Sequence, residues 1–162
     1  MQKLSILIAG VILFSLPAAA QEYPKLEIFG GYQLTHLEPS FNASGWNASF
    51  AGNANHWFGI AADFSGAYKS GAKLHTFMFG PVFSYRKNER ITPFAHALLG
   101  GAVASGGGTA TAFSIALGGG FDVRVNKQFA VRLVQGDWML FHSGGIWDKK
   151  DARVSAGVVF RF

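Results

Sequence analysis

Seven charged side chains fall at positions that alternating strand patterns assign to one polar face. The set contains carboxylates and guanidinium groups, and its members are Glu27, Asp63, Asp122, Arg124, Arg132, Arg153 and Arg161. If this face lines the interior of a narrow barrel, the charges lie in a nearly dry space, where an unpaired charge carries a large desolvation cost. We therefore expect structural ion pairs inside the barrel, with no group placed to react with a substrate.

One pair in this set can be predicted by name. Glu27 lies near the start of the first predicted strand, and Arg161 lies near the end of the last one. The first and last strands are neighbours in a closed barrel, and both residues fall near the same end of it. We therefore expect a Glu27–Arg161 contact. A gated path for protons or ions is the functional alternative to a purely structural network.

The remaining potentially reactive residues form no recognisable site. The histidines show no metal-binding spacing, although His36, His75 and His142 near the outer strand ends leave a surface metal site as an alternative to simple rim residues. No pattern selects a catalytic Ser–His pair. The glycine runs at 106–108 and 118–120 lack the Lys-Ser/Thr of a phosphate-binding loop. The sequence predicts no enzyme and no catalytic, cofactor-binding or metal residues.

The element that must carry Arg153 and Arg161 is the final stretch, residues 151–162. Its even-numbered positions are apolar and its odd-numbered positions are charged or small apart from Val159. A β-strand directs alternate side chains to opposite faces, so this stretch reads as a strand with one apolar and one polar face. An apolar face turned to lipid and a polar face turned to a lumen fit it best.

Seven earlier stretches repeat this pattern. Residues 25–36, 45–53, 57–68, 74–86, 92–104, 112–125, 129–141 and 151–162 are the eight expected strands. They are long enough to cross a bilayer, which takes ~9–11 tilted residues per strand. Connections after even-numbered strands are short, whereas those after odd-numbered strands are longer. With the amino terminus in the periplasm, the expected external loops are residues 37–44, 69–73, 105–111 and 142–150, where any surface partner would bind.

Three strands contain irregular positions. Pro81 predicts a bulge or a local irregularity, because proline cannot donate to a ladder. In the fifth strand the alternation is weaker, and placing the polar His96 in the lumen turns Leu99 outward. In the seventh strand, Arg132 has the opposite parity to Gln135 and Asp137, so either a bulge near 134–136 resets the register or the latter two side chains stand above the lipid.

Composition agrees with a membrane barrel. Charged residues make up 14 % of the 162 residues and hydrophobic residues 49 %, yet no internal run is long enough for a spanning helix. Residues 1–20 read as a cleaved signal peptide: Lys3 precedes a short apolar core, Pro17 breaks it, and three alanines precede Gln21. The net charge of +5 includes no basic run, so nucleic acid is not indicated. There is no cysteine.

The segments GPVFSYR (80–86), PFAHALLGG (93–101), GGGFDVRV (118–125) and VVFRF (158–162) resemble the outer-membrane β-barrel family that includes OmpA, OmpX and the opacity-type proteins. The resemblance covers residues 21–162. It implies an all-β, eight-stranded antiparallel transmembrane up-and-down barrel, monomeric, in the outer membrane of a Gram-negative-type bacterium. It also implies contact with outer-membrane lipid or lipopolysaccharide. Phe160 and Phe162 resemble the signal that the barrel-assembly machinery recognises.

The resemblance specifies the architecture better than the activity. The expected role is structural or surface-interacting, in adhesion or envelope integrity, because an eight-strand lumen is filled by side chains. A narrow porin-like channel is one alternative. A secreted lipocalin-like barrel that binds a small apolar ligand is the other, and it requires the apolar face to point inward. Aromatic residues toward the strand ends favour two membrane-interface girdles: Tyr32, Trp46, Trp57, Tyr68, Tyr85, Trp138, Phe160 and Phe162.

Overall fold

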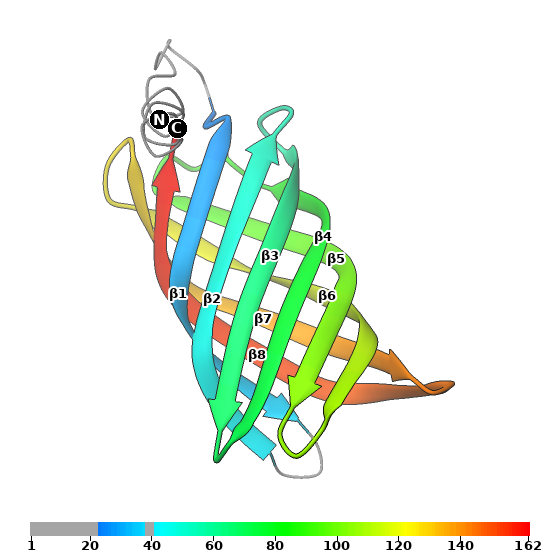
Figure 1. Cartoon of the computed structure of the whole chain (residues 1–162). Coiled ribbons are helices and arrows are strands. Elements are labelled where there is room, and N and C mark those ends of the chain that lie inside the picture. Colours follow the sequence, from blue (N-terminus) through cyan, green and yellow to red (C-terminus); the bar gives the residue numbers. More distant parts are fainter. Residues whose placement is uncertain (1–22, 38–40) are drawn as a thin grey trace, which may run out of the picture.

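The chain forms a closed antiparallel barrel in which each strand pairs with the next and β8 pairs with β1 (Figure 1). The computed structural model describes residues 23–37 and 41–162, so the expected signal peptide (1–20) lies outside the described residues. No helix in the described part is long and apolar enough to cross a bilayer. The strands are β1 (Leu26–Leu37), β2 (Phe41–Asn53), β3 (Phe58–Lys69), β4 (Ala72–Ser84), β5 (Ile91–Ser105), β6 (Thr109–Arg124), β7 (Phe129–Ser143) and β8 (Ile146–Arg161).

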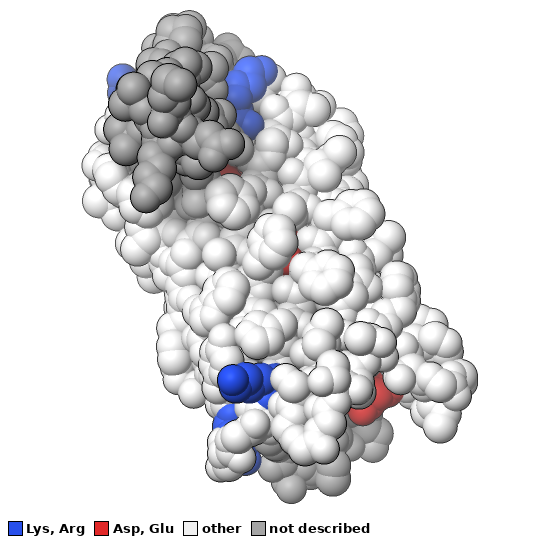
Figure 2. Space-filling view, in the orientation of Figure 1, with Lys and Arg blue, Asp and Glu red and all other residues white. Residues whose placement is uncertain are grey.

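Alternation along each strand places polar side chains inside and apolar side chains outside. On β4, Phe77 and Phe79 are exposed on the outer wall, whereas Thr76 and Met78 are buried in the lumen. Figure 2 shows that the wall on the drawn face is almost free of charge between the two ends of the barrel. The lipocalin-like alternative is wrong, because it required an apolar interior and the observed interior holds the charged groups.

The aromatic residues expected to form interface girdles all lie on the outer wall. Their exposed fractions range from 40 % for Tyr68 to 58 % for Tyr32. Near the end where Lys25 and Phe162 meet, Trp57 and Phe83 stack with ring centroids 6.0 Å apart, and Phe129 meets Phe160 edge to face at 4.8 Å. We call this end, which the sequence analysis expects to face the periplasm, the inner end and the opposite one the outer end. Rings at both ends of an apolar wall are the pattern of a membrane barrel.

The three inner turns are stabilised by the same hydrogen-bonding arrangement. Asn55 Oδ1 accepts hydrogen bonds from the backbone N–H groups two and three residues further on, at 2.9 and 2.8 Å. Asn88 and Asn126 do the same in the next two inner turns. An asparagine that bonds its own backbone in this way stabilises a tight turn without a ladder partner. The sequence signals for turns at these places are therefore confirmed.

The outer connections differ from the expectation. Only Ser70 and Gly71 separate β3 from β4, and only Gly144 and Gly145 separate β7 from β8. All four residues have positive φ, which matches the two-residue hairpin turn that continues strand twist. The strands therefore run through most of the predicted loops 69–73, 105–111 and 142–150. β6 and β8 reach 16 residues each and project as ribbons (Figure 1). In the predicted loop 37–44, β1 extends to Leu37 and β2 begins at Phe41, and residues 38–40 lie outside the described part.

The structure shows how the three strands with irregular sequence patterns are built. β7 contains a bulge between Arg132 and Gln135, so Leu133 and Val134 both face outward while Arg132, Gln135 and Asp137 all face the lumen. The first of the two predicted alternatives is therefore correct. His96 on β5 is buried as expected. At Pro81 the β4–β5 ladder is interrupted, yet the register on either side is the same.

Candidate functional site

The lumen begins, at its inner end, with a carboxylate held by two guanidinium groups. Glu27 on β1 lies 2.8 Å from Arg161 on β8 and 2.7 Å from Arg86, which follows β4. Asn53 donates a further hydrogen bond to Glu27 at 3.2 Å. All these side chains are buried or nearly so. The contact between Glu27 and Arg161 that the sequence predicts is present, and Arg86 joins it from the far wall of the barrel.

Asp122 on β6 continues the network. Arg132 donates to both of its carboxylate oxygens, through Nε at 2.8 Å and Nη2 at 3.1 Å. Arg161 reaches the same carboxylate at 3.3 Å, so it bridges Glu27 and Asp122. A two-point contact between guanidinium and carboxylate is among the strongest polar contacts in proteins. The inner part of the lumen is therefore closed by a five-membered ionic cluster.

Asp137 on β7 accepts several hydrogen bonds halfway along the lumen, in what we call the middle layer. His96 Nε2 lies 2.7 Å from one of its oxygens, and Gln135 and Arg153 donate to the other at 2.9 and 2.7 Å. Gln135 in turn accepts a hydrogen bond from Arg132 at 2.8 Å. Because the bulge in β7 keeps Arg132, Gln135 and Asp137 on the same face, this strand joins the inner layer to the middle one.

Arg153 on β8 crosses the lumen. Its Nη1 donates to Asp63 on β3 at 2.8 Å, and its side chain is 1 % exposed. Asn47 on β2 donates to the other oxygen of Asp63 at 2.9 Å. The pair therefore links separate walls of the barrel at a level where both side chains are almost completely buried.

Four acidic groups and four arginines form the ion pairs described above. Glu27, Asp63, Asp122 and Asp137 face Arg86, Arg132, Arg153 and Arg161, and His96 adds a ring that is uncharged in its neutral form. A set of paired charges avoids the cost of an isolated buried charge. Removal of any one acidic group or arginine leaves this buried set with unequal numbers of positive and negative charges.

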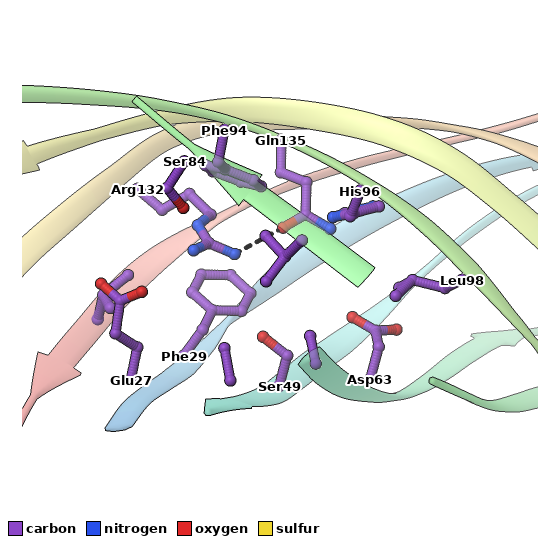
Figure 3. A pocket seen from close by; sticks show the side chains of 14 residues that line it. Glu27, Phe29, Ser49, Asp63, Ser84, Phe94, His96, Leu98, Arg132 and Gln135 are labelled. Atoms are coloured by element: carbon purple, nitrogen blue, oxygen red, sulfur yellow. Dashed lines mark hydrogen bonds between the residues drawn. The ribbon is translucent and has the colours of Figure 1, made fainter. Parts of the chain in front are cut away.

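Between the two layers, Arg132 is sandwiched by aromatic rings. Its guanidinium carbon lies 4.5 Å from the ring centroid of Phe29 and 4.1 Å from that of Phe94. Figure 3 shows both rings beside the guanidinium in a lumenal pocket that Glu27 and Asp63 also line. The cavity has a volume of about 30 Å³, room for roughly two water molecules. The lumen is therefore a packed interior rather than an open channel.

Most of the sequence-predicted residues meet in this network, but Arg124 does not. It has the lumenal parity, yet its side chain is exposed and forms no ion pair within the described residues. The reason is its position: it is the last residue of β6, where the strand leaves the barrel for the inner turn. Phe160 and Phe162 lie on the outer wall, exposed by 41 % and 46 %.

Three network members were not among the predicted site residues. Arg86 has the lumenal parity of β4, and counting alternation through to the strand end would have found it. His96 was placed in the lumen but given no partner. Asp137 required the bulge in β7 to be located first. The described residues contain no group of three or more histidine or acidic side chains placed to hold a metal ion.

An apolar outer wall with aromatic rings at both ends, around a polar and closed lumen, defines an integral outer-membrane β-barrel. Comparison with solved structures bears this out. The chain resembles the neisserial surface protein A, NspA (TM-score 0.67, 14 % identity, 85 % of this chain and 96 % of that one). It also resembles OprG of Pseudomonas aeruginosa (TM-score 0.68, 9 % identity, 88 % and 97 %).

A third similar structure is Ail, the attachment invasion locus protein of Yersinia pestis, in complex with the heparin analogue sucrose octasulfate. It has a TM-score of 0.57 and 19 % identity, over 86 % of this chain and 99 % of that one. No protein-family model and no curated protein matches the sequence. The chain therefore has the eight-strand outer-membrane barrel fold of the OmpA and OmpX type, the fold of outer-membrane proteins of Gram-negative bacteria.

Proposed function

We propose that this protein is a monomeric, non-conducting outer-membrane barrel with a surface-interaction role, in adhesion first and in envelope integrity second. The observation that carries the proposal is the ionic network that closes the lumen, from Glu27 at the inner end to Asp63 in the middle. With the lumen closed and the wall occupied by lipid, the outer hairpins are the parts that a partner can reach.

The β7–β8 hairpin is the strongest candidate for contact with a partner. At its tip, Ile146 is 74 % exposed and Trp147 is 42 % exposed. Trp147 packs on His142 across the hairpin, with ring centroids 4.6 Å apart. Large apolar side chains held on a projecting ribbon are typical of interaction surfaces. Ail, the attachment invasion locus protein, has a similar barrel, and this supports the proposal.

Adhesion assays test this role. The protein is displayed on a non-adherent bacterial host, and attachment to cultured cells and to surfaces coated with sulfated glycan is counted. We expect Ile146→Thr combined with Trp147→Thr to lower attachment several-fold, because the ribbon keeps its ladder but loses its apolar tip. Val125→Thr, an equally exposed position in an inner turn, is the matched control and leaves attachment unchanged. Equal attachment by the tip variant would contradict the proposal.

We also propose that Phe160 and Phe162 act as the assembly signal. Both rings lie on the outer wall of the last strand, where the assembly machinery can contact them before the barrel closes. Phe162→Ser should slow the appearance of the folded form in a pulse-chase experiment. Phe121→Ser, the same change at an exposed position of β6, is the control. Equal rates for the two variants would overturn this assignment.

A further inference from the structure

Three side chains form a hydrogen-bonded chain on the outer wall, across β2, β3 and β4. Trp46 Nε1 lies 3.2 Å from the hydroxyl of Tyr68, and that hydroxyl lies 3.0 Å from His75 Nε2. An indole N–H can only donate, so the Tyr68 oxygen accepts from Trp46. The hydroxyl can still donate its own proton to His75 Nε2, and in that arrangement the ring proton of neutral His75 lies on Nδ1. This nitrogen has no hydrogen-bond partner within residues 23–37 and 41–162.

Gly66 makes this chain possible. It lies between the two partners in the sheet, opposite Trp46 on one side and His75 on the other. A Cβ atom at Gly66 would come within 2.7 Å of both Trp46 Nε1 and the Tyr68 hydroxyl. The absence of a side chain therefore lets the indole and the phenol meet over the strand. The arrangement is built into the sheet and is not a chance contact of surface residues.

The chain lies where the apolar wall ends. Phe79, Phe77, His75 and Lys73 follow one another along the outward face of β4 toward the outer turn. The first two are exposed phenylalanines of the lipid-facing wall, and the next two are a histidine and an exposed lysine. A side chain at this transition faces the headgroup region of the outer leaflet rather than the hydrocarbon.

The charges around the chain are of one sign. β2 and β4 contain no acidic residue, and the one on β3, Asp63, points into the lumen and binds Arg153. Lys69 and Lys73 are exposed at the outer ends of β3 and β4. Figure 2 shows basic side chains at this end of the drawn face, over the β3–β4 turn. No carboxylate on these three strands therefore competes for a ligand of His75 and Lys73.

From these observations we propose that Lys73 and His75 bind a phosphate group of an outer-leaflet glycolipid, with Tyr68 and Trp46 as positioning residues. An ammonium group and an imidazole N–H are both suitable donors to a phosphate oxygen, and the bond is charge-assisted. The hydrogen bond between Tyr68 and His75 Nε2 orients the imidazole so that Nδ1 is the atom presented. A lipid headgroup is the source of the phosphate because the site opens on the lipid-facing wall, at headgroup level.

The experiment uses the refolded full chain in micelles of a maltoside detergent, whose headgroup carries no phosphate. A diphosphorylated lipid A is titrated in, and binding is followed by the NMR signal of the His75 ring, assigned with His75→Gln. We expect saturable movement of this signal. The double variant Lys73→Gln/His75→Gln, monitored through a tryptophan signal of Trp46, should bind about tenfold more weakly, a change of about 1.4 kcal/mol. Lys127→Gln/His56→Gln removes the same residue types from the inner end and should bind like the wild type.

Three outcomes would overturn the proposal. The first is equal binding of dephosphorylated lipid A, which would remove the role of phosphate. The second is an equal response of His75 to inorganic phosphate, which would make this a simple anion site with no lipid headgroup. The third is unchanged binding by the double variant. Heat-dependent mobility in SDS gels verifies that each variant is folded, and Lys73→Gln alone, which keeps the Trp46–Tyr68–His75 chain intact, provides a second variant.

Discussion

Glu27 and Arg161 are separated by 134 positions in the sequence, yet they are direct partners across the β1–β8 ladder, with a contact of 2.8 Å between their side chains. This ladder is the seam at which the barrel closes. The pair can form only when the first and last strands meet. When it forms, each of the two buried charges gains a partner of opposite sign. Closure of the wall and closure of the lumen therefore stabilise each other.

Glu27→Gln tests the inner cluster. The change keeps the size of the side chain, leaves Arg86 without its carboxylate and leaves Arg161 with only its contact to Asp122 at 3.3 Å. Because removal of one partner of a buried pair leaves an uncompensated charge, we expect the free energy of unfolding to fall by about 3–5 kcal/mol. The measurement is urea unfolding in lipid vesicles, followed by tryptophan fluorescence. Glu89→Gln, in an exposed inner turn, is the control, and equal midpoints for the two variants would show that the cluster contributes nothing.

Deletion of Val134 tests the bulge in β7. Without the extra residue, strict alternation through Leu133 still directs Arg132, Gln135 and Asp137 into the lumen, so this variant should fold with a regular β7. Deletion of both Leu133 and Val134 makes Arg132 and Gln135 adjacent and directs one of them into the lipid-facing wall. For this double deletion we expect no folded form, detected as the loss of the heat-sensitive band in SDS gels. A folded double-deletion variant would mean that the register is set elsewhere in the strand.

The pair that crosses the lumen can be removed without a change of net charge. Asp63→Asn combined with Arg153→Gln leaves three acidic groups and three arginines in the network. We expect the wild type to show no conductance in planar bilayers and the double variant to show brief openings, because the middle layer then lacks its bridge between β3 and β8. Steady conductance by the wild type would instead favour the narrow-channel alternative.

The seam also depends on a pair of glycines. Gly31 and Gly157 are opposite each other in the β1–β8 ladder, and a Cβ atom on Gly31 would lie 2.2 Å from the carbonyl oxygen of Ala156. We expect Gly31→Ala to destabilise the barrel by roughly 1–3 kcal/mol, since the backbone must shift to make room. Gly30 is the matched control, because a Cβ atom there meets nothing within 4 Å. Similar unfolding midpoints for the two alanine variants would contradict this.

Much of the architecture could be predicted from the sequence because the period of a β-strand is two. The parity of Phe77 and Phe79 against Thr76 and Met78 determines which side chains meet lipid, and no tertiary information is needed for it. The turns at Asn55, Asn88 and Asn126 were equally readable. The contact between Glu27 and Arg161 followed from closure alone, because any closed barrel makes the first and last strands neighbours.

The extents of the outer strands could not be predicted in this way. Gly-rich and polar segments such as 105–111 and 142–150 have the composition of loops, and composition does not indicate whether a strand ladder continues through them. In the segment 142–150 the ladder continues because Gly144 and Gly145 adopt positive φ and turn the chain within two residues. The ribbons follow from backbone geometry at the turn.

The sequence by itself determined the number of strands, the face of the charges on regular strands and the apolar character of the wall, since these depend only on alternation along the chain. Only the tertiary structure decided the face of Asp137, through the bulge in β7, and which charges meet. Arg153 reaches Asp63 across 90 positions and the width of the lumen, Arg86 joins Glu27 from the segment after β4, and Arg124 remains outside. These pairings depend on the stagger between strands and on side-chain reach across the barrel, which the parity of one strand does not contain.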